Sequence, residues 1–144
     1  MGGHWTDKYI GIPFVEGGRD FNGCDCAGLV LLALKMELGL EALDFREYEK
    51  AHFAGMEGYK YLGKVMAEVI EKDWRVVDEP RPFDLVRFYY GKEPSHVGIW
   101  AGYRNMFLHV EEVGLFTRLT NLHDLSWGPR FFEFRRHKSL MEAA

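Results

Sequence analysis

The spacing of hydrophobic positions changes about halfway along the chain. In residues 25–38 the apolar side chains recur at the intervals of a helix with one buried face, at Leu29, Val30, Leu32, Ala33 and Met36. Gly39 follows this stripe and is typical of a helix end. From residue 74 onward apolar and polar residues alternate, which is the period of strands in a sheet. Helices followed by sequential strands predict an α+β fold with an antiparallel sheet.

The same patterns give the bounds of the expected elements. Helical patterns cover residues 5–10, 25–38, 46–53 and 59–70, the last two separated by a break at 55–58. Strand patterns cover residues 74–77, 84–90, 96–102, 106–111, 114–119 and 130–136, and a loop at 90–95 leads into the third of them. The chain has 144 residues, of which 47% are hydrophobic. This length and composition suit a single domain, residues 1–144, with a substantial core.

Cys26 lies in the first turn of the helix predicted at 25–38, just after a glycine-rich loop. The unpaired backbone N–H groups and the positive dipole end of a helix N-terminus stabilise an anion, and they lower the pKa of a thiol from its free value of about 8.5. Cys26 is therefore a candidate nucleophile, although a lone cysteine on an apolar helix is more often a buried, inert thiol. Cys24 suits neither a relaxed disulfide with Cys26 nor a zinc site, and we expect it to fill space in the loop.

Two histidines fall on neighbouring strand patterns. Residues 95–100 and 105–110 alternate polar and apolar side chains, and residues 102–105 between them have turn composition, which predicts a hairpin. His96 and His109 are then cross-strand neighbours if the register allows. A nucleophilic cysteine needs a base and a group that orients the base, so these two rings and the cysteine form a candidate triad. The remaining histidines lack partners at metal-binding spacing, so we expect no metal or other cofactor and expect surface positions for His4, His52, His123 and His137.

Four linked segments carry a resemblance to a known family. In chain order they are Asp25–Val30, Asp84–Phe88, His96–Trp100 and Phe107–His109. Their order and spacing resemble the NlpC family of papain-like cysteine peptidases over nearly the whole chain. The resemblance implies a papain-like α+β fold in which N-terminal helices pack on a central antiparallel β-sheet. It also implies a hydrolase that cleaves peptidoglycan stem peptides, typically between D-glutamate and a diamino acid, without a cofactor.

The resemblance also assigns roles to individual residues. The nucleophile, the general base and the group that orients the imidazole are, in that order, Cys26, His96 and His109. Asp25 either binds a substrate amine or is simply an acid favoured by the dipole at the helix N-terminus. Phe14 stands where the family usually has a tyrosine that contacts substrate, and the phenol of Tyr9 is a candidate replacement for the missing hydroxyl.

Charge and hydropathy indicate which classes of binding partner to expect. The net charge is −4 with Lys and Arg scattered, so no basic footprint for nucleic acid is present. No apolar run approaches the ~20 residues of a membrane span, and the first residues lack a secretory signal pattern. We therefore expect no membrane or nucleic-acid partner and expect synthesis in the cytoplasm. Contact with the cell wall would then come through lysis, a separate transport system or a phage particle.

Residues 9–14 and 23–26 are most similar to the phage tail-associated and prophage-encoded branch of the family. Phage tail proteins are therefore candidate partners beside the peptidoglycan substrate. Two other function classes stay open: a phage tail component that keeps this fold with little turnover, and a papain-like acyltransferase with a lipid acyl donor. Hydrolysis of muropeptides would count against a tail component with little turnover. Acylation of Cys26 by lipid would favour the acyltransferase.

Overall fold

The computed structural model describes residues 3–41, 67–112 and 115–141. It begins with the 3-10 helix η1 (Trp5–Tyr9), the short strands β1 (Arg19–Asp20) and β2 (Gly23–Cys24), and the helix α1 (Cys26–Leu38). Residues 67–73 are also helical. The other strands are β3 (Trp74–Val77), β4 (Leu85–Tyr90), β5 (Glu93–Trp100), β6 (Met106–His109), β7 (Arg118–Asn121) and β8 (Phe131–His137). The 3-10 helices η2 (Gly128–Arg130) and η3 (Lys138–Leu140) flank β8.

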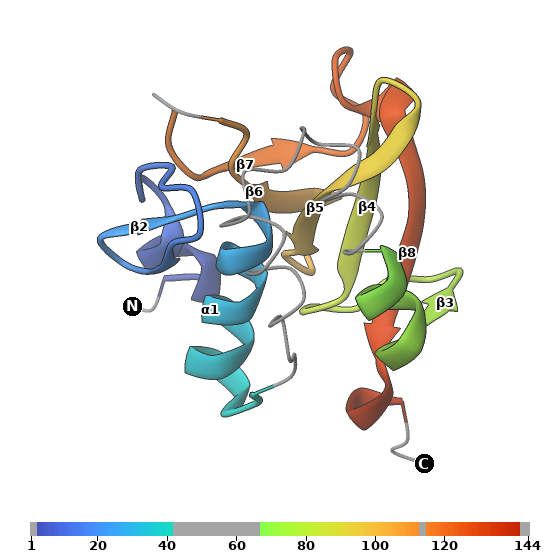
Figure 1. The fold of residues 1–144 in the computed structure, drawn as a ribbon, viewed down its shortest axis with the longest axis horizontal. Coiled ribbons are helices and arrows are strands. Elements are labelled where there is room, and N and C mark those ends of the chain that lie inside the picture. Colours follow the sequence, from blue (N-terminus) through green and yellow to red (C-terminus); the bar gives the residue numbers. More distant parts are fainter. Residues whose placement is uncertain (1–2, 42–66, 113–114, 142–144) are drawn as a thin grey trace.

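The larger sheet has six strands in the order β3-β8-β4-β5-β6-β7. Every neighbouring pair in it is antiparallel. Figure 1 shows α1 beside this sheet, with the loop that carries β2 next to the start of the helix. The expected α+β fold, an N-terminal helix packed on a central antiparallel sheet, is confirmed.

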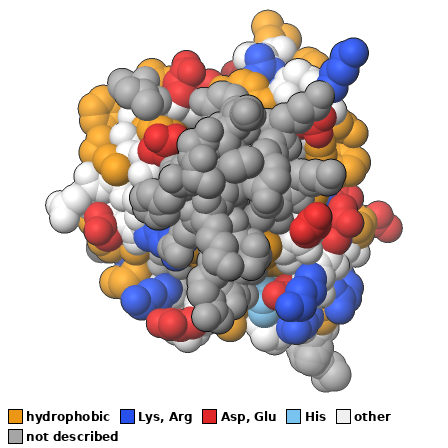
Figure 2. Space-filling view, in the orientation of Figure 1, with side chains coloured by type: hydrophobic (Ala, Val, Ile, Leu, Met, Phe, Trp, Pro, Cys, Tyr) orange, Lys and Arg blue, Asp and Glu red, His pale blue; other side chains and the backbone are white. Residues whose placement is uncertain are grey.

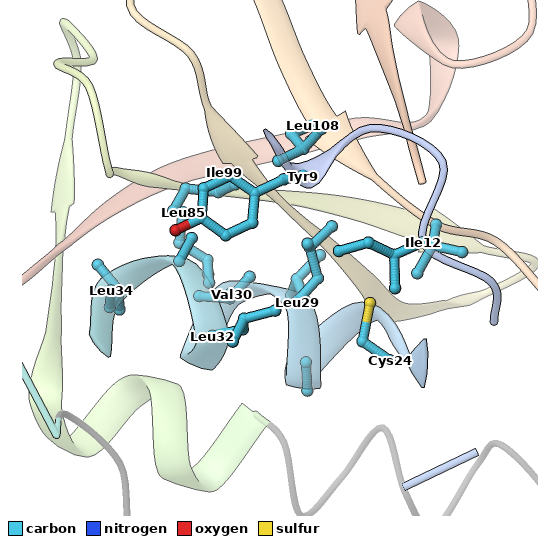
Figure 3. Close-up of a cluster of buried hydrophobic side chains, with 14 of the residues drawn as sticks. Tyr9, Ile12, Cys24, Leu29, Val30, Leu32, Leu34, Leu85, Ile99 and Leu108 are labelled. Atoms are coloured by element: carbon cyan, nitrogen blue, oxygen red, sulfur yellow. The ribbon is translucent and has the colours of Figure 1, made fainter. Parts of the chain in front are cut away.

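The two faces of the sheet bury different kinds of side chain, because successive residues of a strand point to opposite faces. The face toward α1 is aliphatic, and Figure 3 shows Leu85, Ile99 and Leu108 packed over the helix. The opposite face buries a cluster that is mainly aromatic and comprises Val86, Phe88, Trp100, Phe107 and Trp127. Burying one large apolar side chain stabilises a fold by roughly 1.5–3 kcal/mol. The alternation places His96 and His109 on the aromatic face.

The bounds of α1 follow from its sequence. Asp25 is the N-cap, and its Oδ1 accepts the backbone N–H of Gly28 at 2.8 Å; such a cap contributes about 1 kcal/mol. At the other end Gly39 has φ 63°, a left-handed conformation in which its N–H bonds back to the Lys35 carbonyl. The predicted helix 25–38 and its stop at Gly39 are confirmed to within one residue.

Several predicted strand boundaries are wrong, and a local turn explains the early start of β5. β5 begins at Glu93 because Gly91, with φ 64°, closes a tight turn that pairs Tyr90 with Glu93. The segment predicted as a loop at 90–95 is therefore mostly hairpin. The strand predicted at 114–119 begins and ends later, at Arg118–Asn121, where it pairs with β6.

The remaining comparisons concern the predicted helices and two short strands. The short helix predicted at 5–10 is the 3-10 helix η1, whereas β1 and β2 were not predicted. The helix predicted at 46–53 and most of the one predicted at 59–70 lie outside the described residues. Residues 67–70 of the latter are helical, and the helix continues to residue 73.

The face of the molecule drawn in Figure 2 shows no large area in which all charged side chains have the same sign. There Lys and Arg side chains alternate with Asp and Glu side chains around the described part of the molecule. Within the described ranges, no helix has the length and apolarity needed to cross a membrane.

Candidate active site

Cys26 is the first residue of α1, and the preceding loop packs closely against the start of that helix. The backbone N–H of Gly17 donates to Oδ2 of Asp25 at 2.9 Å. A Cβ on Gly28 would lie 1.9 Å from the carbonyl oxygen of Gly18, so only glycine fits there. These contacts hold the N-terminus of α1, and with it the cysteine, in one position relative to the loop.

The sulfur of Cys26 faces backbone donors. The N–H groups of Val97, Ala27 and Cys26 itself bond to it and favour the thiolate. Pairing between β5 and β6 covers only the last two residues of β5, so the N–H of Val97 lies beyond the end of that ladder. Strand N–H groups lie in the plane of the sheet. The thiol that this N–H bonds therefore sits at this edge of β5, beside Val97, which follows His96 in the sequence.

The charge state of the thiol differs from the expectation. Desolvation raises the pKa of the Cys26 thiol to about 12, and the Asp25 carboxylate adds to the increase. The backbone donors act in the opposite direction, as the helix N-terminus predicts, but the free energy of desolvating a charged sulfur is larger. The expected lowering of the thiol pKa is therefore wrong, because desolvation raises this pKa above its ordinary value.

His96 and His109 bond directly to each other. Nε2 of His96 lies 2.9 Å from Nδ1 of His109. The register pairs Ile99 with Leu108, so His109 lies opposite Gly98. His96 comes two residues before Gly98 on the same face of β5, which makes it a diagonal neighbour of His109. A Cβ on Gly98 would lie only 3.3 Å from the Cβ of His109, so the glycine makes room for this diagonal contact. The predicted neighbourhood of the two histidines is confirmed.

Thr120 and Trp127 also contact the histidine pair, and the sequence analysis missed both. Oγ1 of Thr120 lies 2.9 Å from Nε2 of His109. The indole of Trp127 covers both imidazoles, with ring centroids 4.6 Å from His96 and 5.0 Å from His109. Asp124 fixes this indole by accepting the backbone N–H of Trp127 at 3.0 Å. Thr120 was missed because the strand was predicted to end at residue 119.

Burial keeps both imidazoles neutral. It lowers the pKa of His96 to about 3, with the positive charges of Arg130 and Arg118 as further causes. It also lowers the pKa of His109 to about 2, with the charge of His96 and then Arg118 as further causes. A buried, unprotonated imidazole has a free lone pair, which is what a general base requires.

Asp25 and Phe14, two of the predicted substrate contacts, have structural roles here. Both carboxylate oxygens of Asp25 accept backbone N–H groups, as described above. Phe14 is half-buried against the aliphatic core and forms an isolated bridge with Cys24. Contact of Asp25 and Phe14 with substrate stays a prediction.

Tyr9 points away from Cys26. Its ring is fully buried, and its hydroxyl donates to Glu37 at 2.7 Å. Glu37 follows Cys26 by eleven residues in α1, which is roughly 16 Å along a helix axis. Figure 3 shows the oxygen of Tyr9 toward Leu34, with Cys24 at the other end of the helix. The placement gives no support to Tyr9 as a replacement for the family's tyrosine hydroxyl.

Among the remaining cysteine and histidines, Cys24 and His123 lie as the sequence analysis expects and His137 does not. Cys24 is fully buried, as a space-filling residue would be. His123 is exposed and His4 is half-buried, while His52 lies outside the described residues. His137 is buried edge-on against Trp74 at a centroid distance of 5.2 Å, so its expected surface position is wrong. In the described ranges no group of three His, Cys, Asp or Glu side chains could hold a metal ion.

The curated proteins to which the chain is similar include one from Bacillus subtilis and one from Escherichia coli. The probable peptidoglycan endopeptidase LytE of Bacillus subtilis is 23% identical over 128 residues, which cover 88% of this chain and 31% of that protein. The murein DD-endopeptidase MepS/murein LD-carboxypeptidase of Escherichia coli is 28% identical over 134 residues, which cover 90% of this chain and 60% of that protein. The chain thus spans between about a third and three fifths of the length of these curated relatives.

Solved structures share the fold. The NlpC/p60 domain of the peptidoglycan hydrolase SagA superposes with a TM-score of 0.56 at 18% identity, covering 91% of both chains. NlpC1 from Trichomonas vaginalis gives a TM-score of 0.60 at 16% identity, covering 92% of this chain and 41% of that one. The model of the NlpC/P60 family matches residues 11–136, a range that contains the candidate nucleophile and both buried histidines. The chain therefore belongs to the NlpC/P60 family.

Proposed function

We propose that this protein is a cysteine peptidase that hydrolyses an amide bond in peptidoglycan stem peptides through Cys26, His96 and His109. Membership of the NlpC/P60 family and the names of both relatives, which denote peptidoglycan or murein endopeptidases, support the substrate class. The observation that carries the mechanism is the direct bond between the two buried imidazoles, together with the bond from the backbone N–H of Val97, the residue after His96, to the Cys26 sulfur.

His96 acts as the general base. Its Nε2 faces His109, which leaves Nδ1 to receive the thiol proton. Since the thiol and the imidazole both start neutral, the proton moves as the sulfur attacks the scissile carbonyl, not before. His96 then returns the proton to the leaving amine, and a water molecule that His96 deprotonates hydrolyses the thioester.

The start of α1 stabilises the oxyanion that forms during attack. The first N–H groups of a helix have no partner within it. The N–H of Gly28 is held by Asp25, so the donors for the oxyanion are the N–H groups of Cys26 and Ala27, which bond to the sulfur in the resting site and turn to the oxyanion once the sulfur has bonded to the carbonyl carbon. One such donor contributes about 3 kcal/mol to transition-state stabilisation in comparable enzymes.

The scissile bond in this proposal is the one between D-glutamate and the diamino acid, as the family resemblance implies. Asp25 lies one residue before the nucleophile and is the candidate for contact with a substrate amine. The name of the Escherichia coli relative denotes a DD-endopeptidase instead. The masses of the products distinguish these two bonds.

Purified muropeptides, digested and identified by mass spectrometry, test the proposal. We expect cleavage after D-glutamate, and we expect Cys26→Ala to lose turnover while its melting temperature stays close to that of the parent. Cys24→Ala is the matched control, since it removes the other thiol, which is fully buried, and it should keep turnover. Turnover by Cys26→Ala at the parent rate would contradict the mechanism, and products of DD cleavage would contradict the assigned bond.

A further inference from the structure

A chain of polar contacts continues beyond His109 across the sheet. Nε2 of His109 lies 2.9 Å from Oγ1 of Thr120, and Nε of Arg118 donates to the same oxygen at 3.3 Å. The guanidinium of Arg118 also pairs with the carboxylate of Glu111. Thr120 is buried, with 8% of its surface exposed, whereas the side chain of Arg118 is 46% exposed. The contacts therefore run from the buried base to the surface.

The proposed catalysis determines which atom donates and which accepts in this series of hydrogen bonds. When His96 holds the thiol proton, both of its nitrogens bear hydrogen, so its Nε2–H must donate to Nδ1 of His109. A neutral His109 that accepts at Nδ1 bears its own hydrogen on Nε2. That hydrogen needs an acceptor in a buried site, and Oγ1 of Thr120 is the atom at hydrogen-bond distance.

Arg118 holds the hydroxyl in place for this purpose. A guanidinium only donates, so Arg118 occupies one lone pair of Oγ1 and leaves the other for His109. The ion pair with Glu111 in turn restrains the guanidinium. A methyl group in place of the hydroxyl could accept from neither partner.

We propose that Thr120, oriented by Arg118, is a positioning residue that holds His109 in the tautomer His96 needs as a base. The inference rests on the proposed function, because the required direction follows from His96 acting as the base. It adds a third side chain, after His96 and His109, to the series of hydrogen bonds that starts at His96.

The test compares Thr120→Val, which replaces the hydroxyl by a methyl group of similar size, with Thr120→Ser, which keeps a hydroxyl. An unpaired buried donor destabilises the charged state, so Thr120→Val should lower kcat roughly tenfold with KM unchanged, and Thr120→Ser should restore most of it. Thr6→Val is the matched control. Thr6 is also fully buried and bonds a histidine, with Oγ1 2.9 Å from Nδ1 of His4, and this variant should keep the parent kcat.

Nitrogen NMR of histidine-labelled protein gives a readout that does not depend on turnover. We expect His109 of the parent to carry its hydrogen on Nε2, and we expect Thr120→Val to populate the other tautomer while Thr120→Ser does not. Parent-like kcat in Thr120→Val, or a loss of kcat in it with unchanged tautomers, would overturn the inference and leave the proposed function standing. If the parent hydrolyses no muropeptide, the proposed function fails, and the NMR comparison alone decides whether Thr120 sets the tautomer of His109.

Discussion

Mild acid should destabilise this protein strongly because two imidazoles are buried in neutral form. An unfolded histidine has a pKa of about 6.5 and takes up a proton as the pH falls to about 5. In the folded chain burial lowers the pKa of His96 to about 3 and that of His109 to about 2, so neither ring takes up a proton in this range. The unfolded state then binds more protons than the folded state, and stability falls as the pH falls below about 6.5.

The size of the effect follows from the shifted pKa values. Each pH unit below about 6.5 lowers the free energy of unfolding by about 1.4 kcal/mol per ring, so at about pH 5 the loss is roughly 2 kcal/mol per ring and 4 kcal/mol for the pair. This is a large part of the 5–15 kcal/mol that is typical of a domain. At about pH 5 ordinary carboxyl groups, with pKa values of about 4, remain charged and contribute little.

Guanidinium unfolding at about pH 7.5 and about pH 5 measures this loss. The variant His109→Asn keeps a polar side chain but removes one titrating ring, so its stability should change less between the two pH values, by roughly 2 kcal/mol. Subtracting the variant's pH-dependent change in the free energy of unfolding from the parent's cancels the contributions of the titrating groups that both proteins share. An equal pH dependence in the two proteins would refute the claim that His109 is neutral in the fold.

Three more predictions concern the start of α1 and its core. Asp25→Asn keeps an oxygen for the N-cap but removes the charge that raises the pKa of Cys26, so iodoacetamide should alkylate Cys26 several-fold faster at about pH 8; an unchanged rate would contradict this cause. Gly28→Ala should lower the free energy of unfolding by about 3 kcal/mol in a denaturant titration, because its Cβ meets the carbonyl of Gly18, and a smaller loss than about 1 kcal/mol would show that the loop yields. Tyr9→Phe should lower it by about 1 kcal/mol and leave kcat/KM unchanged, since the hydroxyl bonds at the far end of α1; a fall in kcat/KM would restore Tyr9 as a substrate contact.

Sequence patterns predicted the parts of this fold that local periodicity determines. The helical stripe and Gly39 defined α1 to within one residue, and the alternating segments predicted most of the antiparallel sheet. The start of β5 was missed because it depends on the left-handed turn at Gly91, which a tight hairpin needs but which composition alone does not locate. Thr120 was missed for a related reason, since its meeting with His109 depends on the pairing of β6 with β7.

The charge state of the thiol could not be predicted from the sequence, for a different reason. The position of Cys26 at a helix N-terminus is visible in the sequence, and its effect on the thiol has the expected sign. Desolvation depends on what covers the sulfur in three dimensions, and here it outweighs the helix donors. A motif can therefore identify a nucleophile without identifying how that nucleophile is activated.

Burial of the histidine pair links stability to the catalysis proposed for this site. Trp127 covers both imidazoles, and the same desolvation that keeps His96 unprotonated makes the fold sensitive to acid. A free histidine would lose its lone pair to a proton below a pH of about 6.5, whereas His96 keeps it as long as the fold persists. If His96 is the base, its acid limit is then set by unfolding and not by titration of the folded site. Substitutions that let water reach the rings would exchange acid stability for a base that protonates earlier.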